Sequence, residues 1–139
     1  MNVKLSSVTK DDWDLIYDIR INKEYRKNFY IQQDFSKEYH YSYLENKEKL
    51  DTFFHWMILD DNTSVGYIRI LDNDISIMIH PQYIGKGIGS QALALVEKEA
   101  KKLGLHKLIG RIMIENKSSK KIFEKNNYNL KMFWFEKDI

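Results

Sequence analysis

The feature that most constrains the fold is the segment 75–91, in which an apolar run is followed by alternating glycines and then by a helical pattern. Residues 75–80 are rich in isoleucine, which is typical of a strand. Pro81 ends that strand, because proline has no N–H for a ladder and its φ is fixed. Glycine then recurs at 85, 87 and 89, and apolar residues recur at helical spacing over 91–103. The sequence therefore predicts a strand, a glycine-rich turn and a helix N-terminus.

This unit predicts a site for a phosphate or pyrophosphate group. The first N–H groups of a helix lack intrahelical partners and lie at the positive end of the helix dipole. Glycine lets a ligand approach the backbone without meeting a Cβ, and Lys86 adds a positive charge in the same turn. Two familiar motifs do not fit, because the dinucleotide fingerprint G-x-G-x-x-G fails at Ser90 and no P-loop pattern occurs. We therefore expect a phosphate-binding turn of a different kind, the alternative being glycines that only mark a tight turn.

The rest of the chain predicts strands and helices around one sheet. The strands are expected at 3–8, 53–59, 65–71, 74–80, 108–114 and 130–135. The helices are expected from Thr9 to about residue 21, from Ser36 onward, over 91–103 and from Ser118 to Lys125. The order is β-α-α-β-β-β-α-β-α-β, with a tight hairpin turn at Asp72-Asn73. This order predicts an α/β (α+β) fold with a mostly antiparallel central sheet.

Composition bounds the class of protein. A chain of 139 residues can bury its own core, and we expect residues 1–139 to form a single domain. The first residues lack the apolar stretch of a signal peptide, and no apolar run approaches the length of a membrane span. We therefore expect a cytoplasmic protein with no membrane partner. The formal net charge of +2 is spread along the chain, which argues against a nucleic-acid partner.

Two motifs resemble those of the GCN5-related N-acetyltransferases (GNAT family). The family pattern Arg/Gln-x-x-Gly-x-Gly/Ala, between a strand and a helix, reads here Ile84-Gly85-Lys86-Gly87-Ile88-Gly89, so that isoleucine stands in the Arg/Gln position. The longer phrase over 80–87 is similar to the RimJ/RimL-type branch. The second motif, N-x-x-[AS]-x-x-[LI]-Y-x-K-x-G-F, is matched by Asn116, Ser119, Ile122, Phe123, Lys125, Asn127 and Tyr128. The predicted order of elements is also that of the family, so the resemblance covers most of the chain.

The resemblance implies acetyl-CoA as co-substrate, without a metal, and assigns residues to it. The backbone of Ile77, Met78 and Ile79 would pair with the pantetheine arm, as an added strand does. The pyrophosphate would lie against Gly85, Lys86, Gly87, Ile88, Gly89 and Ser90. Asn116, Ser119 and Phe123, from the second motif, would complete the cofactor site.

The resemblance also implies direct transfer of the acetyl group to a primary amine. Backbone N–H groups of residues 77–79 would stabilise the oxyanion, and the lack of cysteine excludes a Cys-acyl intermediate on this chain. The family often has tyrosine at the position of Phe123, and that hydroxyl protonates the departing CoA thiolate. Phenylalanine has no proton to give, so the reaction would need water, another donor or release of the thiolate itself.

Three residues are candidates for the base that deprotonates the amine. Asp74 is the first, because it precedes Pro81 by seven residues, where similar sequences often carry glutamate. An aspartate beside Asn73 is also an ordinary hairpin residue. His80 is the second candidate, and Glu115, at the end of a predicted strand, is the third.

The amine itself is less constrained by the sequence. Specificity is expected from the N-terminal helices and the exposed face of the strands, whose large polar and aromatic residues are Arg20, Tyr25, Arg26, Phe29, Tyr30, His40, Trp56, Tyr67 and Arg69. The runs 20–22 and 35–40 resemble acetyltransferases that act on amino-sugar nucleotides. Protein N-terminal amines, polyamines and small-molecule drugs are the alternatives.

The sequence leaves open two other functions and the association of two copies of the chain. The same fold could serve as a non-catalytic acyl-CoA-binding module or sensor, and Glu115 leaves a nucleotide-binding oxidoreductase as a further alternative. The family usually ends with a pair of strands, whereas this sequence predicts one. We therefore expect either a smaller sheet or a second copy that covers its exposed edge, as in a homodimer.

Overall fold

The computed structural model describes residues 1–26 and 33–139, and its central feature is a five-stranded sheet in the order β1-β2-β3-β4-β5. The strands are β1 (Val3–Ser7), β2 (Phe53–Asp60), β3 (Thr63–Leu71), β4 (Asp74–Ile79) and β5 (Ile109–Gly110). Neighbours from β1 to β4 are antiparallel, and β5 runs parallel to β4. The predicted fold class and the strands expected at 53–59, 65–71 and 74–80 are confirmed.

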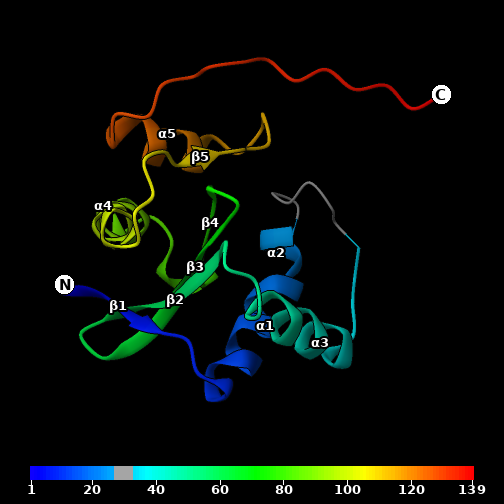
Figure 1. Cartoon of the computed structure of the whole chain (residues 1–139), viewed down its shortest axis with the longest axis vertical. Helices are drawn as coiled ribbons and strands as arrows, with labels where there is room; N and C mark the ends of the chain where they lie inside the picture. Colours follow the sequence, from blue (N-terminus) through cyan, green and yellow to red (C-terminus); the bar gives the residue numbers. More distant parts are fainter. Residues whose placement is uncertain (27–32) are drawn as a thin grey trace.

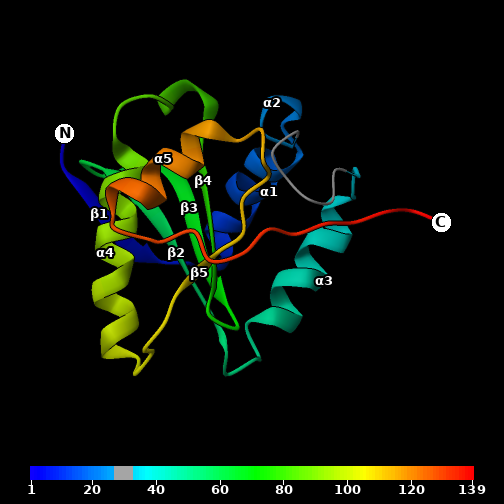
Figure 2. The ribbon, with the colours of Figure 1, turned by 90° about the horizontal axis from the view of Figure 1, so that it is seen from above.

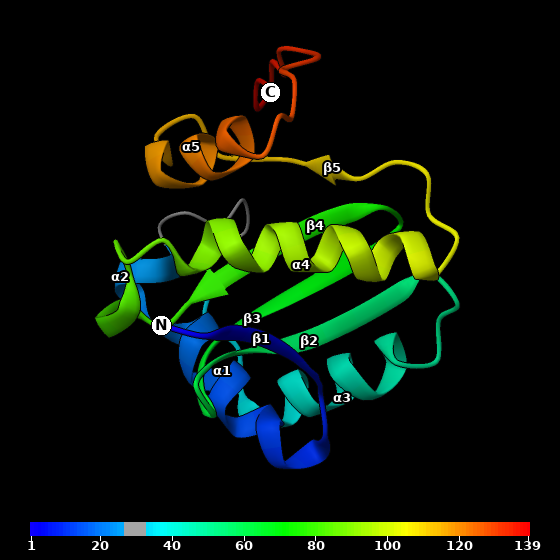
Figure 3. The ribbon, with the colours of Figure 1, turned by 90° about the vertical axis from the view of Figure 1, so that its left-hand side faces the viewer.

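Helices cover both faces of this sheet. The α-helices are α1 (Trp13–Ile21), α2 (Lys23–Arg26), α3 (Lys37–Lys47), α4 (Ile88–Lys102) and α5 (Lys117–Lys125), and the short 3-10 helices are η1 (Lys10–Asp12) and η2 (Pro81–Tyr83). Figures 2 and 3 show α4 on one face of the sheet and α1 with α3 on the other. The β4-β5 edge lies beside α5, which follows β5 in the chain.

The two faces follow from the alternation of side chains along the strands. On one face, Ile58, Ile68 and Ile70 are fully buried against the apolar stripe of α4. On the other face, Met57, Tyr67 and Met78 pack with the apolar residues of α1 and α3, which are Trp13, Ile16, Ile19 and Leu44. In the register, Met57 is opposite Tyr67 and Tyr67 is opposite Met78, so the residues of the second face form a row across three strands. Alternate residues of the same strands therefore face the two helix layers, one set facing α4 and the other facing α1 and α3.

Turn and cap residues act as the sequence predicts. Asp72 and Asn73 both have positive φ, at 51° and 70°, which is the geometry of a tight two-residue hairpin. Ser36 caps α3 by accepting from the Tyr39 backbone N–H at 3.1 Å. Gly104 (φ 81°) and Asn127 (φ 67°) follow the ends of α4 and α5 in the left-handed region.

Two predicted strands and one helix start were wrong. The strand expected over 108–114 joins the sheet only at Ile109–Gly110. The strand expected over 130–135 does not form; this segment runs away from the body of the molecule (Figure 1), with Phe133 79% and Phe135 90% exposed. A strand needs a partner edge, and the two-residue β5 offers almost none. The helix expected to begin at residue 91 begins at Ile88, because Gly87 already supplies its left-handed N-cap.

Candidate functional site

The site begins where β5 separates from β4. The two strands pair only at Asp74 with Ile109 and at Ile75 with Gly110, and no strand in the described part of the chain pairs with residues 77–79 on that side. The His80 N–H donates to the Val65 carbonyl at 2.8 Å, so the even-numbered groups of β4 point toward β3. The N–H groups of Ile77 and Ile79 therefore point toward the open side. We call residues 77–79 the open edge of β4.

A glycine loop lies beyond the end of this edge. Gly85 and Gly87 have φ of 86° and 79°, a region that other residues enter only with strain. Gly87 is the N-cap of α4, and the first intrahelical bond runs from the Gln91 N–H to the Gly87 carbonyl. The N–H groups of the first helical turn are therefore available to an anion. A Cβ at either glycine would meet no atom within 4 Å, so backbone conformation and not crowding requires glycine there.

The side chains of the predicted loop residues serve different purposes. Lys86 is exposed, and its ammonium lies 5.6 Å from the centre of the Tyr83 ring. Ile88 is buried in the core, so only its backbone can face a ligand. Gly89 allows α5 to approach α4, because a Cβ there would lie 2.8 Å from the Ile122 Cδ1 atom. The Ser90 hydroxyl accepts from the Asn126 side-chain amide at 3.0 Å, which ties α4 to the end of α5.

The second motif folds into the cap and core of α5. The Asn116 side chain accepts from the Ser119 backbone N–H at 3.2 Å, which makes it the N-cap of the helix. Phe123 is 8% exposed and lies edge-to-face against Tyr128, with ring centres 4.9 Å apart. Its ring also covers Gly110, where a Cβ would lie 2.5 Å from the Phe123 Cε1 atom. These contacts position β5, and they give the predicted cofactor residues Asn116, Ser119 and Phe123 a structural role.

Asp74, the first candidate base, lies at the closed end of β4. Its two carboxylate oxygens accept from Arg111 at 3.2 and 3.3 Å, and Arg69 lies 3.7 Å away. The hydrogen bond and charge of Asp74 raise the pKa of Arg111. The same residues line a cavity of about 320 Å³. Both oxygens are therefore engaged by Arg111, and this geometry favours a role in holding β5.

The other two candidate bases, His80 and Glu115, lie in turns outside the strand β4. His80 caps the short helix η2, where its Nδ1 atom faces the Gln82 N–H at 3.5 Å and its ring lies against Tyr83. Glu115 is exposed in the turn before α5. Neither side chain has a recorded hydrogen bond to the open edge within residues 1–26 and 33–139.

A hydroxyl group from the helical layer of α1, α2 and α3 contacts the open edge. The Ile79 N–H donates to the hydroxyl oxygen of Tyr25, which comes from α2. The Tyr25 ring is partly buried against the cluster that α1 and α3 form with the sheet, and burial raises the pKa of this phenol to about 12. The sequence placed Tyr25 among the specificity residues, and nothing in its local pattern indicated contact with a strand 54 positions away.

Two of the other predicted specificity residues, His40 and Arg20, connect helices to each other. His40 is fully buried; its Nε2 atom faces the Trp13 carbonyl at 2.8 Å and its Nδ1 atom faces Arg20 at 3.2 Å. Burial lowers the pKa of His40 to about 4. The Arg20 guanidinium lies over the Phe35 and Tyr43 rings at 4.5 and 4.7 Å. This group joins α1 to α3.

Tyr67 and Trp56, from the same set, lie on opposite faces of the sheet. Tyr67 is buried, and its hydroxyl meets the His55 Nδ1 atom at 2.9 Å. Trp56 packs on the opposite face, beside the α4 cluster. Phe29, Tyr30 and the side chain of Arg26 lie outside the described residues.

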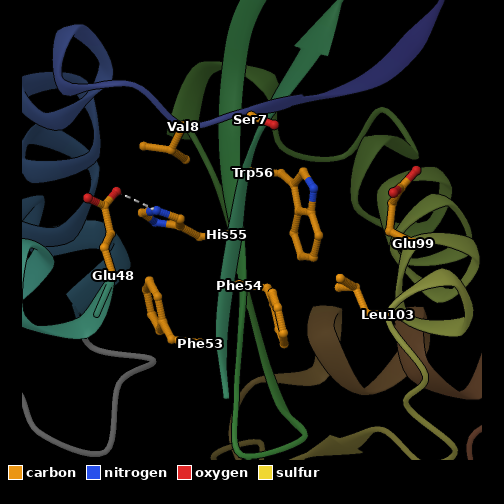
Figure 4. A pocket seen from close by; sticks show the side chains of 9 residues that line it. All are labelled: Ser7, Val8, Glu48, Phe53, Phe54, His55, Trp56, Glu99 and Leu103. Atoms are coloured by element: carbon orange, nitrogen blue, oxygen red, sulfur yellow. Dashed lines mark hydrogen bonds and ion pairs between the residues drawn. The ribbon is translucent and has the colours of Figure 1, made fainter. Parts of the chain in front are cut away.

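Another cavity lies away from this site. It has a volume of about 420 Å³ and lies along β2 where β1 ends, at the other side of the sheet from β4 (Figure 4). Glu48 and His55 face one side of β2 there, with their side chains 2.9 Å apart, and Trp56 and Leu103 lie on the other side. Its lining has no glycine loop or helix N-terminus. We therefore place the candidate site at the open edge of β4.

Comparisons with known proteins identify the family of this chain. A family model described as an acetyltransferase (GNAT) domain matches residues 2–129. An uncharacterized protein of Methanocaldococcus jannaschii is 35% identical over 132 residues, which cover 86% of this chain but 26% of that protein. The chain thus spans about a quarter of the length of that relative.

Solved structures share the fold over nearly the whole chain. A domain from Methanocaldococcus jannaschii has a TM-score of 0.81 at 29% identity, covering 92% of this chain and 88% of that one. RimL, a ribosomal L7/L12 alpha-N-protein acetyltransferase in complex with coenzyme A, has a TM-score of 0.82 at 15% identity, covering 95% and 82%. At the lower identity, the likeness concerns the fold alone. Among the described residues, no helix is both long and apolar enough to cross a bilayer.

Proposed function

Because the chain belongs to the acetyltransferase (GNAT) domain family, we propose that it is an acetyl-CoA-dependent N-acetyltransferase that acts on a primary amine. The observation that carries this proposal is the open edge of β4 ending at a positive-φ glycine loop and a helix N-terminus. An extended ligand with a pyrophosphate at one end fits both features at once. Acetyl-CoA has that form.

The backbone supplies most of the binding in this proposal. The pantetheine arm, which carries amide groups, pairs with the open edge as an added strand would. The pyrophosphate lies against the N–H groups of Ile88, Gly89 and Ser90 at the start of α4. Lys86 contributes charge from an exposed position in the loop. Ile84, where the family has Arg or Gln, is 51% exposed and offers no hydrogen bond from its side chain.

The chemistry is direct attack of a neutral amine on the thioester carbonyl. N–H groups of the open edge stabilise the oxyanion that forms. Asp74 stays the named base candidate from the sequence, although its bonds to Arg111 favour a structural role. Water is the alternative acceptor of the amine proton, because the open side of β4 is not covered by a described strand.

The acceptor amine belongs to one of three classes in this proposal. These are an amino-sugar nucleotide, a small amine such as a polyamine and a protein N-terminus. The phrase over 80–87 supports a RimJ/RimL-like branch, and the fold shared with RimL is compatible with it. Pairing of two copies through the exposed edge beside β5 is also part of the proposal.

The test is release of free CoA thiol from acetyl-CoA, measured with a thiol reagent in the presence of each class of amine. Transfer predicts amine-dependent thiol release and an acetylated product of the expected mass. Isothermal titration with acetyl-CoA is run in parallel. Binding without thiol release with any amine would instead support the second candidate, a non-catalytic acyl-CoA-binding module, which the buried Phe123 favours. Absence of binding would contradict both.

A further inference from the structure

Arg20 is a half-buried cation without an acidic partner. Its guanidinium is 3.2 Å from the His40 Nδ1 atom, and the Phe35 and Tyr43 rings lie against it at 4.5 and 4.7 Å. Among the described residues, the recorded ion pairs do not include Arg20. Residues 27–32, outside the described part, contain no aspartate or glutamate.

The contacts of Arg20 do not neutralise its charge. The His40 Nε2 atom is 2.8 Å from the Trp13 carbonyl, which can only accept, so Nε2 carries the proton and Nδ1 accepts from Arg20. Burial lowers the pKa of His40 to about 4, so this ring is uncharged at neutral pH. The two aromatic rings stabilise the guanidinium through cation–π contacts, but they carry no net charge. Arg20 therefore keeps a positive charge that calls for an anion.

Arg69 provides a second guanidinium on the same face of the sheet. It follows Tyr67 by two positions on β3, so its side chain faces the layer of α1 and α3, as that of Tyr67 does (Figure 3). In the register Arg69 is opposite Ser76, which precedes the open edge of β4. Burial lowers the pKa of Arg20, and the like charge of Arg69 acts in the same direction. The two arginines thus make this part of the face positive.

The cavity beside Arg69 does not supply the missing negative charge. Its charged lining residues are Arg69, Arg111, Asp72 and Asp74. Two arginines and two aspartates balance each other there, and both oxygens of Asp74 accept from Arg111. The surplus charge of the group is therefore that of Arg20.

We propose that the acceptor amine carries an anionic group, a phosphate or a carboxylate, that binds between Arg20 and Arg69. This inference rests on the proposed function and narrows its acceptor class. With the pyrophosphate at the start of α4, the pantetheine arm follows the open edge back toward Ser76, so the thioester lies beside the strand pair that carries Arg69. Neighbouring strands are about 5 Å apart, so the amine nitrogen and the anionic group would be separated by about 5–10 Å.

This charge pattern separates the three acceptor classes of the proposed function. An amino-sugar nucleotide carries phosphate groups, and a guanidinium matches a phosphate or carboxylate with two parallel N–H bonds. A polyamine carries only positive charges, which two arginines repel. A protein N-terminus would fit only where acidic residues follow its amine. A small amine with a phosphate or carboxylate group is therefore the expected acceptor.

The test uses two pairs of amines that differ by one anionic group. Glucosamine is compared with glucosamine 6-phosphate, and hexylamine with 6-aminohexanoate, by release of free CoA thiol from acetyl-CoA. For the wild type, we expect kcat/KM to be at least about tenfold higher for the anionic member of one pair or both, the range of hydrogen bonds to a charged group. The two pairs distinguish a phosphate from a carboxylate, and spermidine should be the poorest acceptor.

Two variants test the arginines. In Arg69→Gln and Arg20→Gln, the ratio of kcat/KM within a pair should fall toward one, and glutamine at position 20 keeps an N–H donor for His40. Lys102→Gln is the matched control, because it removes one cation that pairs with Glu99 at 3.3 Å on α4, on the opposite face of the sheet, and it should keep the ratio. A merely structural role of either arginine would lower the rates of both members of a pair alike and leave the ratio unchanged.

The outcomes separate this inference from the proposed function. Equal kcat/KM within both pairs, or fastest transfer to spermidine, would leave the transferase standing and overturn the anion site. A preference that both folded variants retain would refute the assignment to Arg20 and Arg69, and Arg69→Gln decides by itself if melting shows that Arg20→Gln does not fold.

A wild type that releases no thiol with any amine would refute the transfer. The anion site is then measured by isothermal titration of glucosamine 6-phosphate and glucosamine, and of the second pair, into the protein saturated with CoA. Binding of an anionic member at least about tenfold tighter than its neutral partner, with the difference lost in Arg69→Gln, would support the site. Equal binding within both pairs would overturn it.

Discussion

The two ends of β4 are held in different ways. At its start, β4 pairs with β5, and Asp74 accepts from Arg111 while Arg69 lies close by. The Phe123 ring covers Gly110 from the α5 side. Several independent contacts thus fix the place where β5 leaves the sheet. We call this the closed end of β4.

At its other end, β4 is met, among the described residues, by the strand β3 and by a hydroxyl group. The Ile79 N–H is met by Tyr25, which stands on a helix of four residues. A hydroxyl can exchange its partners with little rearrangement, whereas a pair of charged groups that share two hydrogen bonds cannot. The stabilising contacts thus lie where β4 and β5 pair, and an exchangeable contact lies where the proposed ligand would enter.

The largest expected effect concerns the layer that carries Tyr25. His40 joins α1 to α3 as a neutral ring, with a pKa lowered by burial from 6.5 to about 4. The unfolded chain takes up this proton near the ordinary value, so the stabilisation is complete above pH 6.5 and is lost as the pH falls toward 4. The free energy of unfolding should decrease by about 3 kcal/mol over that window.

Urea unfolding of the wild type and of His40→Gln between pH 7.5 and 4 measures this contribution. Glutamine keeps a donor for the Trp13 carbonyl but does not titrate. The variant should have a lower free energy of unfolding at pH 7.5 and a shallower decrease toward pH 4. Equal slopes for both proteins would mean that His40 is not the group responsible.

The next effect tests the closed end. Gly110→Ala places a Cβ between 2.5 and 2.9 Å from three ring atoms of Phe123, so the ring or β5 must shift. We expect the free energy of unfolding to fall by about 2 kcal/mol. Adding Phe123→Leu should recover part of that loss, because the smaller side chain leaves room. A double-mutant cycle from chemical denaturation would show no coupling if the two residues do not press on each other.

The third effect concerns the glycine loop at the open end. Gly87→Ala puts a Cβ on a residue with φ of 79°, at a cost of about 1.5 kcal/mol. If the loop keeps its shape, the free energy of unfolding should fall by this amount. If the loop relaxes to another conformation, acetyl-CoA should bind more weakly instead. The loss of stability from melting and the loss of binding free energy from titration should together equal about 1.5 kcal/mol. Gly104→Ala, with φ of 81° and equally open surroundings, is the matched control and should lose stability without losing affinity.

The smallest expected effect decides the role of Asp74. Asp74→Asn keeps one acceptor for Arg111 and should lower the free energy of unfolding by about 1 kcal/mol, because the Arg111 side chain is 62% exposed and its ion pair is screened. Its kcat should fall less than about tenfold, whereas loss of a general base costs about 100-fold or more. Asp72→Asn, in the same turn, is the control. A loss of kcat on the larger scale, with stability retained, would restore Asp74 as the base.

Local signals predicted much of the fold. The hairpin turn at Asp72-Asn73, the Ser36 cap and the left-handed Gly104 each depend on a few neighbouring residues, and each was predicted. The strand expected over 130–135 has the right residues for a strand but no edge to join. The residue pattern of a segment indicates which structure it can form. A strand also requires the edge of a neighbouring strand, which the segment itself does not contain.

The sequence by itself determined the strand, the glycine loop and the helix over residues 75–102, because positive φ, helix capping and face alternation are properties of short segments. Only the tertiary structure decided what those glycines and carboxylates contact. Gly89 leaves room for the Ile122 side chain. Asp74 is hydrogen-bonded by Arg111, 37 positions away, and Ile79 by Tyr25, 54 positions away. Such pairs depend on how the helical layers dock onto the sheet. No local pattern encodes that docking, since it is set by the burial of both apolar faces together.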